Sequence, residues 1–244
     1  MKSRDGVTVV TRDGSGKAKP MPTDFRSVLS PYGQSPVSSE VGQSSVLIRR
    51  LGLADYETTL DRMRDFTLAR NADTPDELWS VEHPPVYTLG VAAKPEHLPR
   101  TDNDILVIKT DRGGQITYHG PGQVVIYTLL DLRRRNLGVR ALVRKLEQAV
   151  IELLTAYRID AKGREDAPGV YVDGAKVAAL GLRIRNGCCY HGLSLNVDMD
   201  LSPFGAINPC GYPGLEVTQL RDLGVAESMS AVTEKLLARL AAEL

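Results

Sequence analysis

The segment GVYVDGAKVAALGLRIR, residues 169–185, decides the fold class of this chain. At its centre, Asp173-Gly174 is a dipeptide that tolerates the positive φ angles of a two-residue hairpin turn. Apolar runs of the length of a strand flank the dipeptide at 169–172 and 176–185. We therefore predict a β-hairpin that reverses direction at Asp173-Gly174.

Other strand and helix patterns surround this hairpin. Runs typical of strands occur at residues 46–51, 77–82, 86–89, 105–109, 115–118, 123–130 and 188–197. We expect the five runs between residues 77 and 130 to share one sheet. Apolar residues recur at helical spacing over residues 54–70, 139–157 and 231–240, with Ser230 as the N-cap of the last helix. Close-spaced strands with few helices predict an α+β fold, a single domain with a mixed β-sheet flanked by helices.

The length and composition indicate one folded domain. The chain has 244 residues, of which 42% are hydrophobic, enough to bury one sizeable core. Residues 1–45 are rich in Ser, Gly, Pro and charge, so we predict a disordered N-terminal arm there. We expect the catalytic domain to occupy residues 46–244.

Charge and cysteine content restrict the partners and the compartment. The 30 basic and 30 acidic residues cancel, so no net field attracts nucleic acid or an anionic membrane. A run of about 18 apolar residues, which a membrane-spanning helix requires, does not occur. Three cysteines, two of them adjacent, form no disulfide framework, and the N-terminus lacks the pattern of a secretory signal. We expect a cytoplasmic protein.

Cys210 is a candidate nucleophile. It lies in NPCGYPG, residues 208–214, a run of turn-forming residues that predicts a loop. A loop cysteine is more often an ordinary residue than a nucleophile, and at this point both interpretations are open. Because an unperturbed thiol has a pKa of about 8.5, a nucleophilic Cys210 requires a base or a cation beside it.

Lys176 is the candidate partner of this thiol. It follows the predicted turn directly, and its neighbours Val177, Ala178 and Ala179 are small and apolar, so the amine can be desolvated. A neutral lysine would accept the thiol proton, whereas a protonated lysine would stabilise the thiolate; the sequence does not distinguish the two. The alternative is an ordinary surface lysine after a hairpin.

Residues 112–122, RGGQITYHGPG, combine glycines that allow close backbone approach with several polar donors. This segment predicts a substrate cradle. A dinucleotide fingerprint beginning at Gly120 is excluded, because Val125 stands where the third glycine belongs and a strand follows instead of a helix.

Tyr-His-Gly occurs twice, at 118–120 and 190–192, and the two copies either line one pocket from neighbouring strands or repeat by chance. The two-residue period of a strand would place Cys189 and His191 on one face, with His119 as a third metal ligand. Because this ligand set is incomplete, we predict no metal site.

Several blocks together resemble one family, the lipoyl(octanoyl) transferases. They occur in the order found in that family: 82–90, 112–123, 166–171, 176–181, 191–196 and 208–214. The blocks span most of residues 46–220, and only the N-terminal arm lies outside the pattern. The resemblance implies a fold similar to the catalytic domain of lipoate and biotin ligases.

The resemblance also implies an activity in protein lipoylation and lipoate biosynthesis. An octanoyl group would pass from octanoyl-acyl carrier protein, through a thioester on Cys210, to a lysine of a lipoyl domain, without ATP or another cofactor. The implied acceptors are lipoyl domains of 2-oxo acid dehydrogenase E2 subunits and the glycine cleavage H protein. Lys176 matches the lysine that lowers the pKa of the cysteine. The implied substrate-binding residues are Arg112, Gly113, Gly114, Gln115, Ile116, Thr117, Tyr118, His119, Ala179, Leu180, Gly181, Gly192, Leu193 and Ser194.

Three other functions are weighed against this one. A ligase that activates a free acid with ATP is disfavoured, because such ligases resemble one another in a longer glycine run than Gly113-Gly114 and need no thiol at Cys210. A binding protein would act without chemistry, and a thioesterase would use water as the acceptor. A basic cluster from Arg133 to Lys145 is either a solvated face or a docking surface for an acidic carrier protein.

Overall fold

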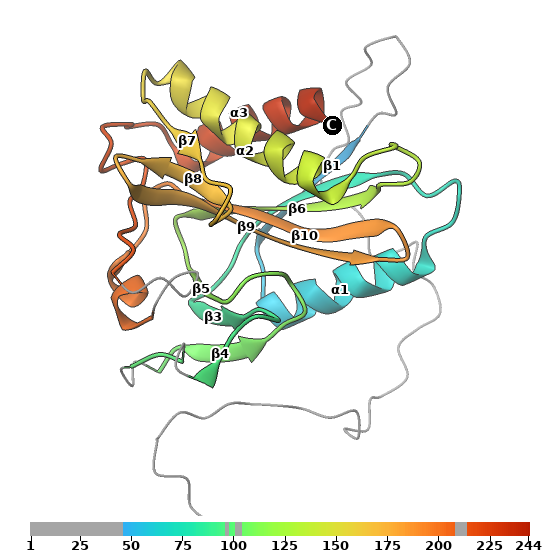
Figure 1. The fold of residues 1–244 in the computed structure, drawn as a ribbon, viewed down its shortest axis with the longest axis horizontal. Helices are drawn as coiled ribbons and strands as arrows, with labels where there is room; N and C mark the ends of the chain where they lie inside the picture. Colours follow the sequence, from blue (N-terminus) through green and yellow to red (C-terminus); the bar gives the residue numbers. More distant parts are fainter. Residues whose placement is uncertain (1–45, 96–97, 101–103, 208–213) are drawn as a thin grey trace, which may run out of the picture.

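The computed structural model describes residues 46–95, 98–100, 104–207 and 214–244. Seven strands of this part of the chain form one sheet (Figure 1). In spatial order they are β1 (Leu47–Leu53), β2 (Glu77–Glu82), β6 (Gln123–Asp131), β10 (Cys188–Asn196), β9 (Ala175–Arg185), β8 (Gly169–Val172) and β7 (Lys162–Gly163). Strands β1 and β2 pair in parallel, and the other neighbours in the order pair antiparallel. The prediction of an α+β fold with a mixed sheet is confirmed.

A smaller sheet corrects the expectation that residues 77–130 form one sheet. Strands β3 (Val86–Leu89), β4 (Leu106–Lys109) and β5 (Ile116–His119) form a separate sheet in the order β4-β3-β5. Pro84 and Pro85 separate β3 from β2. Proline has no N–H to donate to a ladder, so the chain leaves the main sheet at these residues.

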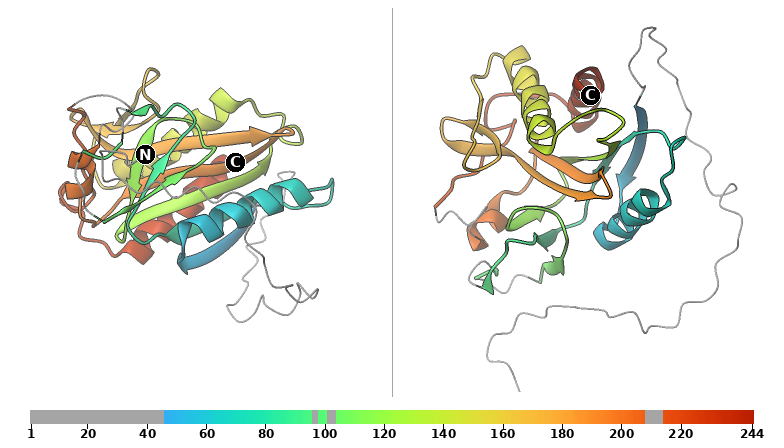
Figure 2. Two further views of the ribbon diagram at one scale, coloured as in Figure 1. Left: turned by 90° about the horizontal axis from the view of Figure 1, so that it is seen from below. Right: turned by 45° about the vertical axis from the view of Figure 1, so that its right-hand side comes forward.

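Helices cover both faces of the main sheet. Helices α2 (Val139–Ala156) and α3 (Met229–Glu243) lie on one face, and α1 (Tyr56–Ala69) lies on the other beside the small sheet (Figures 1 and 2). The expected cap of α3 is wrong: Ser228, with extended backbone, is the N-cap, and its hydroxyl accepts a hydrogen bond from the Ala231 amide at 3.3 Å. None of the described helices is both long and apolar enough to cross a membrane.

Three apolar clusters hold these layers together. The largest lies between α2, α3 and the sheet, where Leu142, Leu146 and Leu153 of α2 are fully buried. Their spacing of four and seven residues places them on one helix face. A second cluster lies between α1 and the sheet, and a third joins the small sheet to the 3-10 helix η2 (Ser202–Ala206). The small sheet therefore has its own core, beside the main sheet.

The predicted hairpin is confirmed. Asp173 and Gly174 have φ angles of 49° and 87°, as a two-residue turn between right-twisted strands requires. Val172 pairs with Ala175, and Tyr171 pairs with Lys176. The turn therefore places Lys176 near the start of β9, in the interior of the sheet order.

Candidate functional site

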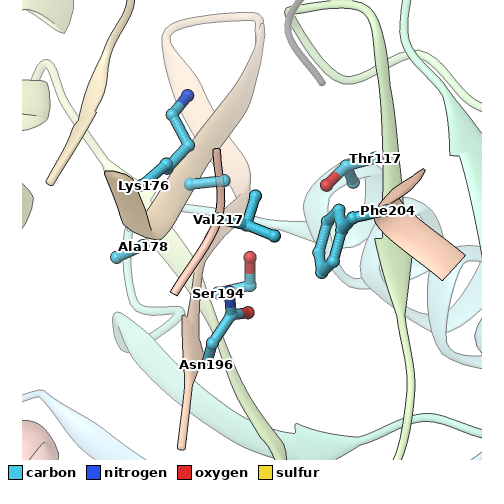
Figure 3. Close-up of a pocket in the computed structure, with 8 residues that line it drawn as sticks. Thr117, Lys176, Ala178, Ser194, Asn196, Phe204 and Val217 are labelled. Atoms are coloured by element: carbon cyan, nitrogen blue, oxygen red, sulfur yellow. The ribbon is translucent and has the colours of Figure 1, made fainter. Parts of the chain in front are cut away.

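Two adjoining pockets lie beside β9 and β10, and together they are called the cavity. Both are lined by Thr117, Ala179 and Ser194. The first pocket adds Lys176, Ala178, Asn196, Phe204 and Val217, with Thr117 and Phe204 across from Lys176 and Ala178 (Figure 3). The second pocket adds Tyr56, Arg112, Gly114, Gln115, Ile116, His119, Val125, Tyr127, Leu180, Gly181, His191, Gly192 and Leu193. Lys176 thus lies toward one end of the cavity and His191 toward the other.

Lys176 is held in place at its end of the cavity. Only 3% of the residue is exposed, so the predicted desolvation is confirmed. Its Nζ donates to the Pro168 carbonyl at 3.3 Å and lies 5.1 Å from the centre of the Tyr171 ring, a cation–π distance. Its backbone is fixed as well, because the Lys176 N–H donates to the Glu216 carbonyl at 2.8 Å.

Glu147 of α2 supports this arrangement from behind. Its Oε1 accepts a hydrogen bond from the Gly169 amide at 2.9 Å. Gly169 in turn packs on the lysine so closely that an added Cβ would lie 2.9 Å from Lys176 Cε. Burial raises the pKa of Glu147, whereas the Gly169 hydrogen bond and the positive charge of Lys176 oppose that rise. The sequence analysis did not select Glu147, because it is one of several charged residues on an amphipathic helix.

Two paired glycines line the second pocket. Gly181 of β9 pairs with Gly192 of β10. A Cβ on Gly192 would collide with the Ile126 carbonyl of β6, so this position requires glycine. The Gly113 amide donates to the Leu182 carbonyl at 2.8 Å, which fixes residues 112–115 against β9. The structure therefore brings the three predicted substrate segments together, although Gly113 and Tyr118 do not line the pockets.

The side chain of Arg112 donates hydrogen bonds to backbone carbonyls of its own loop. The side chain is buried, and Nη2 donates to the carbonyls of Thr88 at 2.6 Å and Gln115 at 2.8 Å. Nη1 donates to the Gly113 carbonyl at 2.9 Å. These hydrogen bonds explain how an arginine can be tolerated beside an apolar cavity.

His119 closes the inner end of the cavity from β5. Its Nδ1 pairs with Gln123 Oε1 at 2.7 Å, and its ring stacks on Tyr56 with centres 5.8 Å apart. Burial lowers the pKa of His119 to about 3. The ring is therefore neutral at physiological pH.

His191 of β10 lines the same pocket as His119, and its backbone conformation is unusual. Its φ angle is 62°, a conformation that only a few per cent of non-glycine residues adopt. The ring packs against Tyr190 and Tyr127, and Nε2 donates to Asp111 Oδ1 at 2.9 Å. Tyr190 also donates to Asp111, at 2.6 Å.

This backbone corrects the expectation that Cys189 and His191 share a strand face. Cys189 belongs to the cluster under α2 and α3, whereas the positive φ turns His191 toward Tyr127. Burial raises the pKa of the Cys189 thiol to about 12, which makes it a poor metal ligand. No group of three His, Cys, Asp or Glu residues in the described chain could hold a metal ion. Both Tyr-His-Gly histidines do line one pocket, but from different sheets.

Comparisons with known proteins agree with this geometry. A family model described as the lipoyl protein ligase A/B catalytic domain matches residues 55–241. An octanoyltransferase of Laribacter hongkongensis is 61% identical over 197 residues, 81% of this chain and 95% of that protein. An octanoyltransferase of Azoarcus sp. is 60% identical over 195 residues, 80% of this chain and 86% of that protein. The chain belongs to the lipoyl(octanoyl) transferase family.

Solved structures extend the likeness of the fold beyond this transferase family. A lipoate-protein ligase A bound with ATP superposes with a TM-score of 0.67 at 15% identity, covering 82% of this chain and 85% of that chain. A biotin protein ligase from Aquifex aeolicus gives a TM-score of 0.51 at 15% identity, covering 81% and 69%. The predicted likeness to both ligase folds is confirmed.

Two further predictions for this octanoyltransferase-family chain concern Cys210 and the basic cluster from Arg133 to Lys145. Cys210 lies outside the described residues, so its role stays a prediction. The basic cluster is only partly a solvated face: Arg134 and Arg135 bind the buried Asp76 at 2.7 and 2.5 Å. Those two arginines neutralise an internal carboxylate and are engaged inside the fold.

Proposed function

We propose that this protein transfers an octanoyl group from octanoyl-acyl carrier protein to the acceptor lysine of lipoyl domains, through a thioester on Cys210. The observation that carries the proposal is the buried amine of Lys176 at one end of a cavity that the predicted substrate segments line. The 60% and 61% identical relatives are named octanoyltransferases, which supports the same acyl group here.

The surroundings of Lys176 support its pairing with Cys210. Glu216, six positions after Cys210 in the sequence, accepts a hydrogen bond from the Lys176 amide, and the Thr218 amide donates back to the Lys176 carbonyl at 3.0 Å. Residues 216–218, which follow Cys210 in the sequence, are therefore fastened to the backbone of Lys176. A buried amine next to a thiol either accepts its proton or stabilises the thiolate, and both routes activate the nucleophile.

The reaction proceeds in two balanced steps. The Cys210 thiolate attacks the thioester carbonyl of the donor, a new carbon–sulfur bond forms, and the carrier thiol leaves with the proton that Lys176 received. The neutral amine of the acceptor lysine then attacks the acyl-enzyme, an amide bond forms, and the Cys210–acyl bond breaks. Lys176 takes the proton that the amine loses and returns it to the thiol.

The walls of the cavity suit a saturated acyl chain. Ile116, Val125, Leu180 and Leu193 line it together with the glycine pair of β9 and β10. An apolar chain gains about 0.8 kcal/mol for each methylene that it buries. The same cavity gives a lipoyl-domain lysine its target, because the acyl carbonyl would stay at the Lys176 end. We propose lipoyl domains of 2-oxo acid dehydrogenase E2 subunits and the glycine cleavage H protein as acceptors.

Intact mass spectrometry tests the proposal directly. The protein is mixed with octanoyl-acyl carrier protein, its mass is recorded, a lipoyl domain is added, and both masses are recorded again. We expect an octanoyl adduct on the protein that moves to the domain without ATP. Cys210→Ser should abolish the adduct, whereas Cys188→Ser, which changes a buried cysteine outside the cavity, should retain it.

Other outcomes point to other functions. Transfer only from free octanoate with ATP would indicate a ligase. Release of octanoate without a modified domain would indicate a thioesterase, and transfer by Cys210→Ser at the rate of the unchanged protein would exclude the thioester mechanism.

A further inference from the structure

A row of hydrogen-bonded side chains begins at Arg112, which lines the second pocket. Arg112 donates through Nε and Nη2 to Thr88 Oγ1 at 3.1 and 2.9 Å. Thr88 Oγ1 lies 3.5 Å from Nε2 of His119, and Nδ1 of His119 lies 2.7 Å from Oε1 of Gln123. These side chains therefore join the small sheet to β6 of the main sheet.

The row continues through Asn196 to the first pocket. Gln123 and Asn196 are paired residues of β6 and β10, and Gln123 Nε2 donates to Asn196 Oδ1 at 2.9 Å. Asn196 lines the first pocket, as Lys176 does (Figure 3), and its Nδ2 donates to the Thr218 carbonyl at 2.9 Å. The whole row is called the relay, and its members are Arg112, Thr88, His119, Gln123, Asn196 and Thr218.

Only one arrangement of protons satisfies every bond of the relay. A guanidinium only donates and a carbonyl only accepts, so the two ends fix the direction. The Thr218 carbonyl requires the amide nitrogen of Asn196, which leaves Asn196 Oδ1 to accept from Gln123. Gln123 Oε1 then accepts from Nδ1 of His119, so Nε2 of that ring accepts from the Thr88 hydroxyl. Burial lowers the pKa of His119 to about 3, and the relay therefore holds this ring as one neutral tautomer.

Thr218, at the far end of the relay, belongs to the segment that is hydrogen-bonded to the backbone of Lys176. The Lys176 N–H donates to the Glu216 carbonyl at 2.8 Å, and the Thr218 N–H donates to the Lys176 carbonyl at 3.0 Å. The backbone of Asn196 fixes the same segment, because its carbonyl accepts from the Leu220 N–H at 3.1 Å. Asn196 is therefore the link between the relay and the backbone position of Lys176.

Gln123 and Asn196 are polar residues in the interior of the sheet, 1% and 5% exposed. Amide side chains are mostly exposed in proteins, and burying them is costly unless their hydrogen bonds are made. Apolar side chains of similar volume would fill the same space without that requirement. Packing alone therefore does not account for the two amides, whereas fixing the position of the groups that they bond does.

We propose that Gln123 and Asn196 are positioning residues that hold Lys176 at the end of the cavity where acyl transfer takes place. The inference rests on the proposed function and adds two residues to it. Asn196 acts through Thr218 and the Lys176 backbone, and Gln123 orients the amide of Asn196. A displaced Lys176 would stabilise the thiolate of the nucleophile less, so the thiolate would form only at higher pH.

Asn196→Leu tests the proposal, because leucine keeps the branched shape of the side chain and removes its hydrogen bonds. Single-turnover formation of the octanoyl adduct from octanoyl-acyl carrier protein is followed by intact mass across a series of pH values. We expect the rate at neutral pH to fall about 10- to 100-fold and the midpoint of its pH dependence to rise by about one pH unit. A residue that only stabilises the fold would lower Tm and leave this midpoint unchanged.

Gln123→Met provides a second variant, which interrupts the relay one residue further from Lys176. The rate should fall about three- to tenfold, and the midpoint should move in the same direction by a smaller amount. The double variant with Asn196→Leu should lose no more rate than Asn196→Leu alone, because both changes break the same row of bonds. Losses that simply add in the double variant would show that the two amides act independently and would overturn the relay.

Gln219→Met is the matched control. Gln219 is also a buried amide, which accepts from the Met199 N–H at 2.7 Å and donates to Asp222 at 3.2 Å, but it lines neither pocket. Its Tm should fall, whereas its midpoint should equal that of the unchanged protein. An unchanged midpoint in both Asn196→Leu and Gln123→Met, or an equal rise in Gln219→Met, would overturn the proposal. Absence of an octanoyl adduct on the unchanged protein would instead refute the proposed function itself.

Discussion

The two ends of the cavity present opposite electrostatic environments. At one end, the Lys176 amine lies against a carbonyl and an aromatic ring, with the carboxylate of Glu147 behind Gly169. At the other end, His119 and His191 are buried, and burial lowers the pKa of both rings. The first end holds a buried amine, whereas the second holds two histidine rings that burial keeps neutral beside the guanidinium of Arg112.

Under the proposed function, the reaction takes place at the Lys176 end and the other end contacts the acyl chain. Proton transfer requires a group whose charge can change, and Lys176 is the only lysine that lines the two pockets in the described part of the chain. Thr117, Ala179 and Ser194 line both pockets and so lie between the two ends.

Removing the charge at the Lys176 end should have the largest effect. Lys176→Met keeps an unbranched side chain of similar length and should lower kcat/KM for octanoyl transfer by about 10²- to 10⁴-fold, the usual contribution of an acid–base group. Steady-state transfer to a lipoyl domain measures the loss. Lys162→Met, which changes an exposed lysine on β7, should leave the rate unaltered. A loss of less than threefold in Lys176→Met would contradict a role in proton transfer.

Adding a side chain at Gly192 should destabilise the fold. Gly192→Ala places a methyl group against the Ile126 carbonyl and should destabilise the protein by about 1–3 kcal/mol. For a chain of this size, that corresponds to a fall in Tm of about 2–4 °C per kcal/mol in thermal unfolding. Gly205→Ala should change Tm little, because a Cβ there meets nothing within 4 Å. Equal Tm values for the two variants would show that β6 and β10 can separate at low cost.

The buried ring of His119 should make the free energy of unfolding depend on pH. An unfolded histidine binds a proton below pH of about 6.5, whereas folded His119 binds one only near its pKa of about 3. The unfolded state therefore holds the extra proton in this window, and the free energy of unfolding falls as pH falls, by about 1.4 kcal/mol per pH unit for each such histidine. Urea unfolding between pH 6 and 5 should show a slope smaller by that amount in His119→Gln. An unchanged slope would mean that His119 titrates normally in the folded protein.

Neutralising the support behind Lys176 should have the smallest effect. Glu147→Gln keeps an oxygen that accepts from the Gly169 amide and removes only the negative charge. We expect octanoyl transfer to slow by about two- to fivefold, because the positive charge on Lys176 loses a stabilising neighbour. Glu152→Gln, an exposed change on the same helix, is the control in the same transfer assay. Equal rates for the two variants would show that Glu147 acts only through its hydrogen bond.

The fold and the site were predictable to different extents. The hairpin at Asp173-Gly174 and the helix over residues 139–157 follow from local backbone preference and apolar spacing, and the structure confirms both. The division into two sheets was missed, because strand propensity does not record which strands pair. Lys176 was selected from its place after the turn, and its burial is confirmed.

Residues of the candidate site outside the family blocks were the hardest to find. Tyr56 and Glu147 lie on regular helices, where their patterns resemble those of ordinary amphipathic residues. Asp111 precedes the Arg112 block by one position and gave no signal of its own. These residues belong to the site only because helices and strands far apart in the sequence pack together around it.

The sequence alone determined the local elements and the family to which the motifs point, and it predicted a cysteine and a lysine suited to a thioester donor. These properties depend on residue type and spacing, which the chain carries without folding. Only the tertiary structure decided that Lys176 lies buried at one end of the cavity and that two histidines with lowered pKa values lie at the other, since both depend on burial. The structure also decided on which face of the sheet the His191 side chain lies, because the positive φ of this residue interrupts the two-residue period of a strand.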